Sequence, residues 1–144
     1  MTRDEIEAAL ANLAPKLDRL RALSTLDAFT AAASKGDPAA FAAFRAEADP
    51  IAAEVDAVMA AIGRALNEAE KKSAAGNPAA MMTLAAKQRS AGAPHPLLSQ
   101  WGDATPADWP ACLAAADEHR RQFRFWASTV EDFRIRALKR IATL

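Results

Sequence analysis

The residues best suited to chemistry lie near the carboxy-terminal end of the sequence, where basic and aromatic side chains alternate. Within residues 119–126 the chain reads His-Arg-Arg-Gln-Phe-Arg-Phe-Trp. Arginines can grip a phosphate backbone, and aromatic rings can stack on bases. This interleaving is typical of a nucleic-acid-binding surface. Its candidate contacts are Arg120, Arg121, Arg124, Arg134, Arg136, Lys139 and Arg140.

The same pattern has a simpler interpretation as an amphipathic helix. Long arginine stems can cover the apolar flank of a helix while their charges stay in water. Acidic side chains also fall at helical spacing from several of these arginines, so local ion pairs are expected. The pairs that the spacing predicts are Asp117 with Arg121, Glu131 with Arg134, and Asp132 with Arg136. We therefore favour the amphipathic helix over the nucleic-acid surface.

Cys112 and His119 are the one pair that suggests nucleophilic catalysis. They are seven residues apart, which on a helix is two turns, or about 10 Å. That distance is too long for the imidazole to activate the thiol directly. Cys112 is also the only cysteine, so no internal disulfide is possible. We interpret Cys112 as a small core residue.

Other catalytic and metal-binding signatures are missing from the sequence. The Glu-x-x-His motif of di-iron helical bundles is absent. Two histidines and one cysteine are too few for a zinc or haem site. The five glycines form no phosphate-cradling loop, and no Gly-x-Ser-x-Gly elbow occurs. We expect no enzyme, no cofactor and no metal site, although a site assembled from distant residues would escape this search.

The composition predicts an all-α fold. Of 144 residues, 39 are alanine, whereas Val, Ile, Leu, Met, Phe and Trp together number 34. Alanine is the strongest helix former, and three valines are too few for much sheet. This length is typical of one domain, so residues 1–144 are expected to form a single helical bundle of four to five helices.

The charge distribution is too even to indicate a nucleic-acid-binding protein on its own, although its mild polarity could steer self-association. The net charge is zero, with −3 on residues 1–72 and +3 on residues 73–144. The first residues lack the apolar stretch of a secretion signal. No run approaches the ~20 apolar residues that a membrane span needs. The sequence therefore predicts a cytoplasmic protein without a membrane span.

Pairs of a capping residue and a proline mark the helix starts. Asp37-Pro38, Asp49-Pro50, Asn77-Pro78 and Thr105-Pro106 all have this form. The apolar spacing stays in phase across Pro15, which favours one kinked first helix over two helices. The predicted helices span about 3–33 (kinked at Pro15), 38–48, 50–72, 78–91 and 106–143.

The last of these is the longest helix, and two of its apolar residues lie off its main stripe. It starts either at Thr105 or at Asp108. Its apolar stripe has one break, at Arg120, and contains Leu113, Ala116, Phe123, Trp126, Val130, Phe133, Ala137, Ile141 and Leu144. Phe125 and Ile135 fall outside this stripe, so we expect a second packing surface to cover them.

Residues 92–105 form the one stretch without helical periodicity. Pro94 and Pro96 predict an extended path for this loop. The loop contains three large apolar residues that a purely connecting, solvent-exposed linker would not need: Leu97, Leu98 and Trp101. They either fold back and plug one end of the bundle or form an exposed lip that engages a partner.

The sequence is best interpreted as a non-enzymatic helical subunit for protein–protein interaction or assembly, which associates with itself or with another protein. Its expected partner-binding residues are Leu97, Leu98, Trp101, Phe125 and Ile135. The first alternative is a nucleic-acid-binding protein that uses the basic face of the last helix. The second is a small-molecule or catalytic pocket between helices, near Trp101, Trp109 and Trp126.

Overall fold

The computed structural model describes residues 1–25, 38–90, 94–97 and 107–144. Within these ranges the chain forms four helices and no strand. They are α1 (Arg3–Leu23), α3 (Ala39–Ala74), α4 (Pro78–Ser90) and α5 (Trp109–Ala142). The prediction of an all-helical protein with a long carboxy-terminal helix is confirmed.

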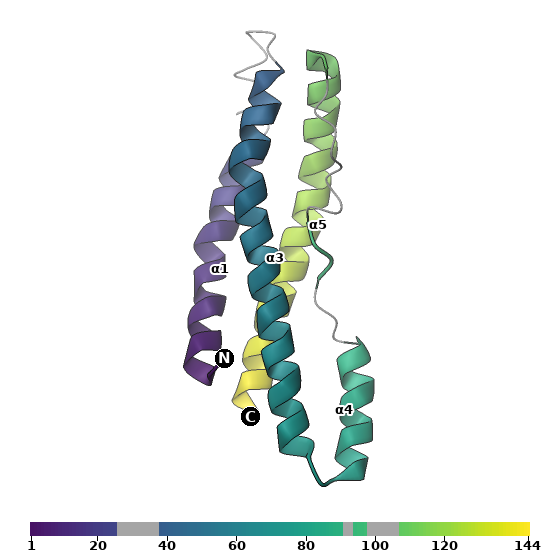
Figure 1. Ribbon diagram of the computed structural model, residues 1–144. Helices are drawn as coiled ribbons and strands as arrows, with labels where there is room; N and C mark the ends of the chain where they lie inside the picture. The colour runs from purple at the N-terminus through teal and green to yellow at the C-terminus, as the bar shows by residue number, and fades with distance from the viewer. Residues whose placement is uncertain (26–37, 91–93, 98–106) are drawn as a thin grey trace.

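Three long helices lie side by side, and the short α4 stands beside one end of α3 (Figure 1). α3 and α5 run in the same direction, while the shorter α1 runs in the opposite direction (Figure 1). Because α3 and α5 are parallel, the chain must travel back along the bundle between them. α4 and residues 94–97 belong to this return (Figure 1).

α1 begins with a capping box formed by Thr2 and Glu5. The Thr2 hydroxyl accepts a hydrogen bond from the Glu5 amide at 3.2 Å, and the Glu5 carboxylate accepts one from the Thr2 amide at 2.6 Å. Both bonds satisfy amides that the first helical turn leaves open. Pro15 lies inside α1, and the helix continues on both sides of it. The prediction that α1 does not split at Pro15 is confirmed.

α1 ends earlier than predicted, at Leu23. Ser24 caps it, with its amide donating to the Leu20 carbonyl at 2.9 Å. The Thr25 hydroxyl donates to the Ala22 carbonyl at 3.2 Å. A threonine hydroxyl that bonds in this way competes for backbone groups, and threonine therefore favours helix ends over helix interiors. The predicted end at residue 33 is wrong, and residues 26–33 lie outside the described ranges.

The two predicted helices 38–48 and 50–72 are a single helix, α3, with Pro50 inside it. The Asp49 side chain does not cap a new helix, because both its carboxylate oxygens accept from Arg45 Nε at 2.9 Å. Ala48 and Ala52 on either side are fully buried. A break at Pro50 would turn one of them away from the core, so the packing keeps the helix continuous despite the missing backbone bond.

The predicted starts of the two remaining helices are explained by their caps. The Asn77 side chain accepts from the Ala80 amide at 3.1 Å, just after Gly76 turns the chain at φ +82°. The Asp108 side chain accepts from the Ala111 amide at 2.9 Å, and α5 begins at the next residue. Of the two starts considered for the last helix, the structure therefore selects Asp108.

The core is formed by the facing stripes of α1, α3 and α5. In α5 the buried positions repeat at alternating steps of four and three residues, the spacing of helices that wind around one another. This stripe differs from the predicted one: Leu113 is half-buried and Leu144 is exposed, while Cys112, His119 and Arg140 are buried. The principal buried positions of α5 are Cys112, Ala116, His119, Phe123, Trp126, Val130, Phe133, Ala137 and Arg140.

Candidate functional site

Arg140, one of the candidate nucleic-acid contacts, is buried near the end of α5 with only 8% of its surface exposed. Its guanidinium forms a two-pronged ion pair with Glu70 of α3, through Nε at 2.7 Å and Nη2 at 2.9 Å. Nη2 also donates to the Asn67 side chain at 2.6 Å. These hydrogen bonds hold the pKa of Glu70 below its ordinary value.

A glutamine from α4 completes this cluster. Gln88 Nε2 donates to Glu70 Oε2 at 3.2 Å and to the Asn67 carbonyl at 3.3 Å. The four residues, which we call the Arg140 cluster, therefore join α3, α4 and α5. Because Arg140 is buried and its Nε and Nη2 are bonded inside the bundle, it is not available to a phosphate backbone. The prediction that Arg140 lies on an exposed basic face is therefore wrong.

Asp56, in the middle of α3, binds the backbone of residues 94–97 and the Trp126 ring of α5. Its carboxylate accepts from the Leu97 amide at 2.9 Å and from Trp126 Nε1 at 3.1 Å. Leu97 is fully buried, so it packs into the core and is not a partner-binding lip. Its amide is bonded to Asp56, in the middle of α3, so it does not plug one end of the bundle. Leu98 and Trp101 lie outside the described ranges.

Replacing Asp56 by alanine is expected to destabilise the fold by about 1–3 kcal/mol, because two buried donors lose their acceptor. The loss should be accompanied by faster hydrogen exchange at the Leu97 amide. Chemical denaturation and amide exchange measure the two effects. Glu54→Ala is the matched control, since Glu54 forms an exposed ion pair with Lys16 that is worth at most about 1 kcal/mol. Equal losses in both variants would contradict the expectation.

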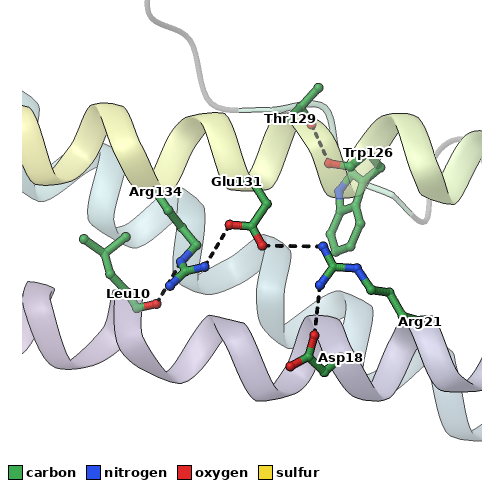
Figure 2. A network of polar contacts seen from close by, with 7 residues as sticks. All are labelled: Leu10, Asp18, Arg21, Trp126, Thr129, Glu131 and Arg134. Atoms are coloured by element: carbon green, nitrogen blue, oxygen red, sulfur yellow. Dashed lines mark hydrogen bonds and ion pairs between the residues drawn. The ribbon is translucent and has the colours of Figure 1, made fainter.

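A chain of polar contacts links α1 to α5 (Figure 2). Asp18 pairs with Arg21 at 2.9 Å, and Arg21 reaches Glu131 at 3.5 Å. Glu131 also accepts from Arg134 Nη1 at 2.8 Å, which is one of the ion pairs that the spacing predicted. Arg134 Nε then donates to the Leu10 carbonyl at 3.2 Å. Arg134 is therefore engaged in joining the two helices.

The other candidate basic residues of α5 lie nearer the solvent. Arg120 is half-buried and 3.7 Å from Asp117, while Arg121 pairs with Glu118 and not with the expected Asp117. Arg136 donates to the Asp132 backbone carbonyl at 3.3 Å. The residues that remain exposed are Arg121, Arg124, Arg136 and Lys139.

An open cleft of about 510 Å³ lies between the end of α1 and the first half of α5. Among the described residues that line it, every charged side chain is an arginine. The Ser24 hydroxyl there is buried and has no hydrogen-bond partner in the described structure. We call this feature the arginine cleft; its lining residues are Arg21, Ser24, Thr25, Arg120, Phe123, Arg124 and Ala127.

The sequence did not indicate the arginine cleft, because Arg21 and Ser24 were assigned to the interior of a longer first helix. The only available signal was the polar pair Ser24-Thr25 after a leucine-rich stripe. That signal marks a helix end, but it does not show which helix lies opposite.

The side of α5 that faces away from the core exposes three large apolar residues, of which Leu138 is the least exposed at 48%. Phe125 is 68% exposed and Ile135 is 53% exposed. They lie on a line of positions spaced by three and four residues with Ser128 and Asp132, and this line is called the outer face of α5. The sequence identified both residues as lying off the main stripe, and the structure places them in solvent.

The remaining candidate groups are enclosed in the core. Burial raises the pKa of the Cys112 thiol, which keeps it protonated. His119 packs edge-on against Phe44 with ring centroids 4.6 Å apart, and burial together with the Arg45 charge lowers its pKa to about 4. Trp126 is buried to 1% exposure, so its ring does not line an open pocket.

Fold and site together define a helical bundle whose accessible features include a cationic cleft and an apolar outer face. No family model, curated protein or solved structure matches the chain. Among the described helices, none combines the length and the hydropathy that a membrane crossing requires.

Proposed function

We propose that this chain is a non-enzymatic assembly subunit that associates with itself through the outer face of α5. The observation that carries the proposal is the 68% exposure of Phe125, a large apolar side chain on a helix whose opposite side is well buried. Ile135 on the same face is 53% exposed. Covering both residues would remove apolar surface from water at about 25 cal/mol per Å².

The spacing of the two residues suits a second copy of the chain. Phe125 and Ile135 are ten residues apart, or about 15 Å along a helix. A two-fold axis at the level of Val130 would lay Phe125 of each copy against Ile135 of the other. Closed dimers use such self-complementary contacts, in which the same surface serves both subunits.

The polar residues of the outer face are compatible with this arrangement. The same axis sets Ser128 of one copy opposite Asp132 of the other, where a hydroxyl can donate to a carboxylate. At the ends of the contact, Arg121 would approach Lys139, and these like charges repel. Because salt screens this repulsion, we expect the dimer to be stronger at high ionic strength.

Size-exclusion chromatography with light scattering, at low and high salt, tests the proposal. We expect a dimer at both salts, and Phe125→Ser and Ile135→Ser should each raise its dissociation constant at least tenfold. Met82→Ser is the matched control, since Met82 is 77% exposed but lies on α4. A monomer at both salts would contradict self-association, as would an equal effect of the Met82 change.

If the chain binds nucleic acid, fewer basic residues are exposed for that contact than the sequence suggested. Arg121, Arg124, Arg136 and Lys139 remain exposed on α5, whereas Arg140 is buried. Binding through these residues would weaken steeply with salt, the opposite of the dimer. A gel shift at low salt with duplex and single-stranded probes tests it. Absence of a shift, or a shift that survives charge reversal at Arg121 and Arg124, would remove this alternative.

A further inference from the structure

We infer that the arginine cleft binds the phosphate group of a small organic phosphate. This site is separate from the outer face of α5 and does not depend on self-association. The inference stands on three features of the cleft: its charge, a buried hydroxyl without a partner, and an apolar floor.

The charge of the cleft comes from two different helices. Arg21 projects from α1, while Arg120 and Arg124 project from α5, and no acidic side chain is among the lining residues. A guanidinium carries five N–H donors. Arg21 uses two of its nitrogens on Asp18 and Glu131, and Arg120 has one contact at 3.7 Å to Asp117. Donors therefore remain in both.

Arg124 is the strongest candidate ligand of the three. It is exposed and forms no ion pair or hydrogen bond within the described part of the chain. Arg21 and Arg120 have carboxylate neighbours, whereas Arg124 has none within the described part of the chain, so an anion in the cleft would pair with Arg124 first. The planar fork of arginine matches the oxygens of a phosphate, with two parallel hydrogen bonds.

The Ser24 hydroxyl gives an independent indication of a ligand. It is buried, at 6% exposure, yet makes no hydrogen bond in the described structure. Buried hydroxyls nearly always have a partner, because an unsatisfied one costs free energy. Thr25 beside it already donates to the Ala22 carbonyl. A phosphate oxygen in the cleft would accept the Ser24 proton.

The size and the floor of the cleft indicate an organic body on the phosphate. A volume of about 510 Å³ lies within the range of ordinary small-molecule sites, roughly 300–1,000 Å³, and exceeds the needs of a bare phosphate. Phe123 and Ala127 supply apolar contact beside the arginines. A ring or short chain attached to the phosphate would cover that floor.

Calorimetric titration of the full chain with inorganic phosphate and with phenyl phosphate tests the inference. We expect saturable binding of both probes, with phenyl phosphate the tighter because its ring meets the apolar floor. Arg124→Gln should weaken phenyl phosphate at least tenfold. Arg121→Gln is the matched control, since Arg121 is exposed on the same helix outside the cleft, and it should change the affinity less than twofold.

Ser24→Ala separates a ligand site from a purely structural role. Removing an unsatisfied buried hydroxyl should leave Tm unchanged or raise it by about 2–4 °C, while the affinity for phenyl phosphate falls several-fold. Phe125→Ser should leave the binding intact, which keeps this result independent of self-association. No saturable binding of either probe, or equal losses in Arg124→Gln and Arg121→Gln, would overturn the inference.

Discussion

Replacing Arg140 by alanine is expected to lower the free energy of unfolding by about 3–5 kcal/mol. The substitution leaves Glu70, which is only 8% exposed, as a buried carboxylate without its charged partner. Asn67 and Gln88 also lose part of the network that joins three helices. The cost comes mainly from the stranded charge and only in part from the lost ion pair.

Chemical denaturation at neutral pH measures this effect, with Lys139→Ala as the neighbouring control. Lys139 is exposed, so its replacement should change the stability by no more than about 0.5 kcal/mol. The double variant Arg140→Met with Glu70→Leu should recover most of the loss, because neither charge then remains in the core. A double variant as unstable as Arg140→Ala would show that the ion pair is not the cause.

The difference in unfolding free energy between wild type and Arg140→Ala should depend on pH. Because the ion pair lowers the pKa of Glu70, its contribution is fully present above the ordinary value of 4.5. It is lost as the pH falls through the lowered pKa. The difference between wild type and Arg140→Ala should therefore shrink in acid.

Acidification itself is expected to destabilise the protein through His119. Burial lowers the pKa of this side chain from its ordinary 6.5 to about 4, so the unfolded chain takes up a proton first. The stabilising contribution is fully present above pH 6.5 and is lost as the pH falls. By pH 4 the loss reaches about 3 kcal/mol. Arg45 adds to it by repelling an imidazolium.

Comparison of the unfolding free energies of wild type and His119→Leu between pH 7.5 and pH 4 measures this contribution. The variant should lose less stability on acidification, by about 3 kcal/mol. His95→Leu is the matched control, since His95 is exposed. This variant should lose as much unfolding free energy on acidification as wild type does. Parallel pH profiles for wild type and His119→Leu would show that the buried imidazole does not govern acid stability.

The helical fold could be predicted because its signals are local. The Thr2 capping box, the Asn77 cap and the Asp108 start all act within one turn of chain. Pro50 misled the prediction because Asp49-Pro50 has the form of a helix start. At Pro15, an apolar stripe that stays in phase on both sides correctly predicted one continuous helix. The apolar stripe also stays in phase across Pro50, where the structure has one continuous helix.

The candidate sites were less predictable because their partners are distant in sequence. Phe125 and Ile135 could be singled out from helical spacing alone. Arg140 could not be separated from its exposed neighbours, because its burial depends on Glu70, seventy residues earlier. Asp56 gave no local signal either, since both the Leu97 amide and the Trp126 ring come from elsewhere in the chain.

The parallel course of α3 and α5 sets an order of folding. Contacts between α1 and α3 close modest loops, as between Arg19 and Glu47, which are 28 residues apart. Contacts between α1 and α5 close far longer ones, as between Arg21 and Glu131 at 110 residues. Since loop-closure entropy grows with length, we expect α1 to pair with α3 before α5 docks. Substitutions in α5, Arg140→Ala among them, should then mainly speed unfolding and leave the folding rate nearly unchanged.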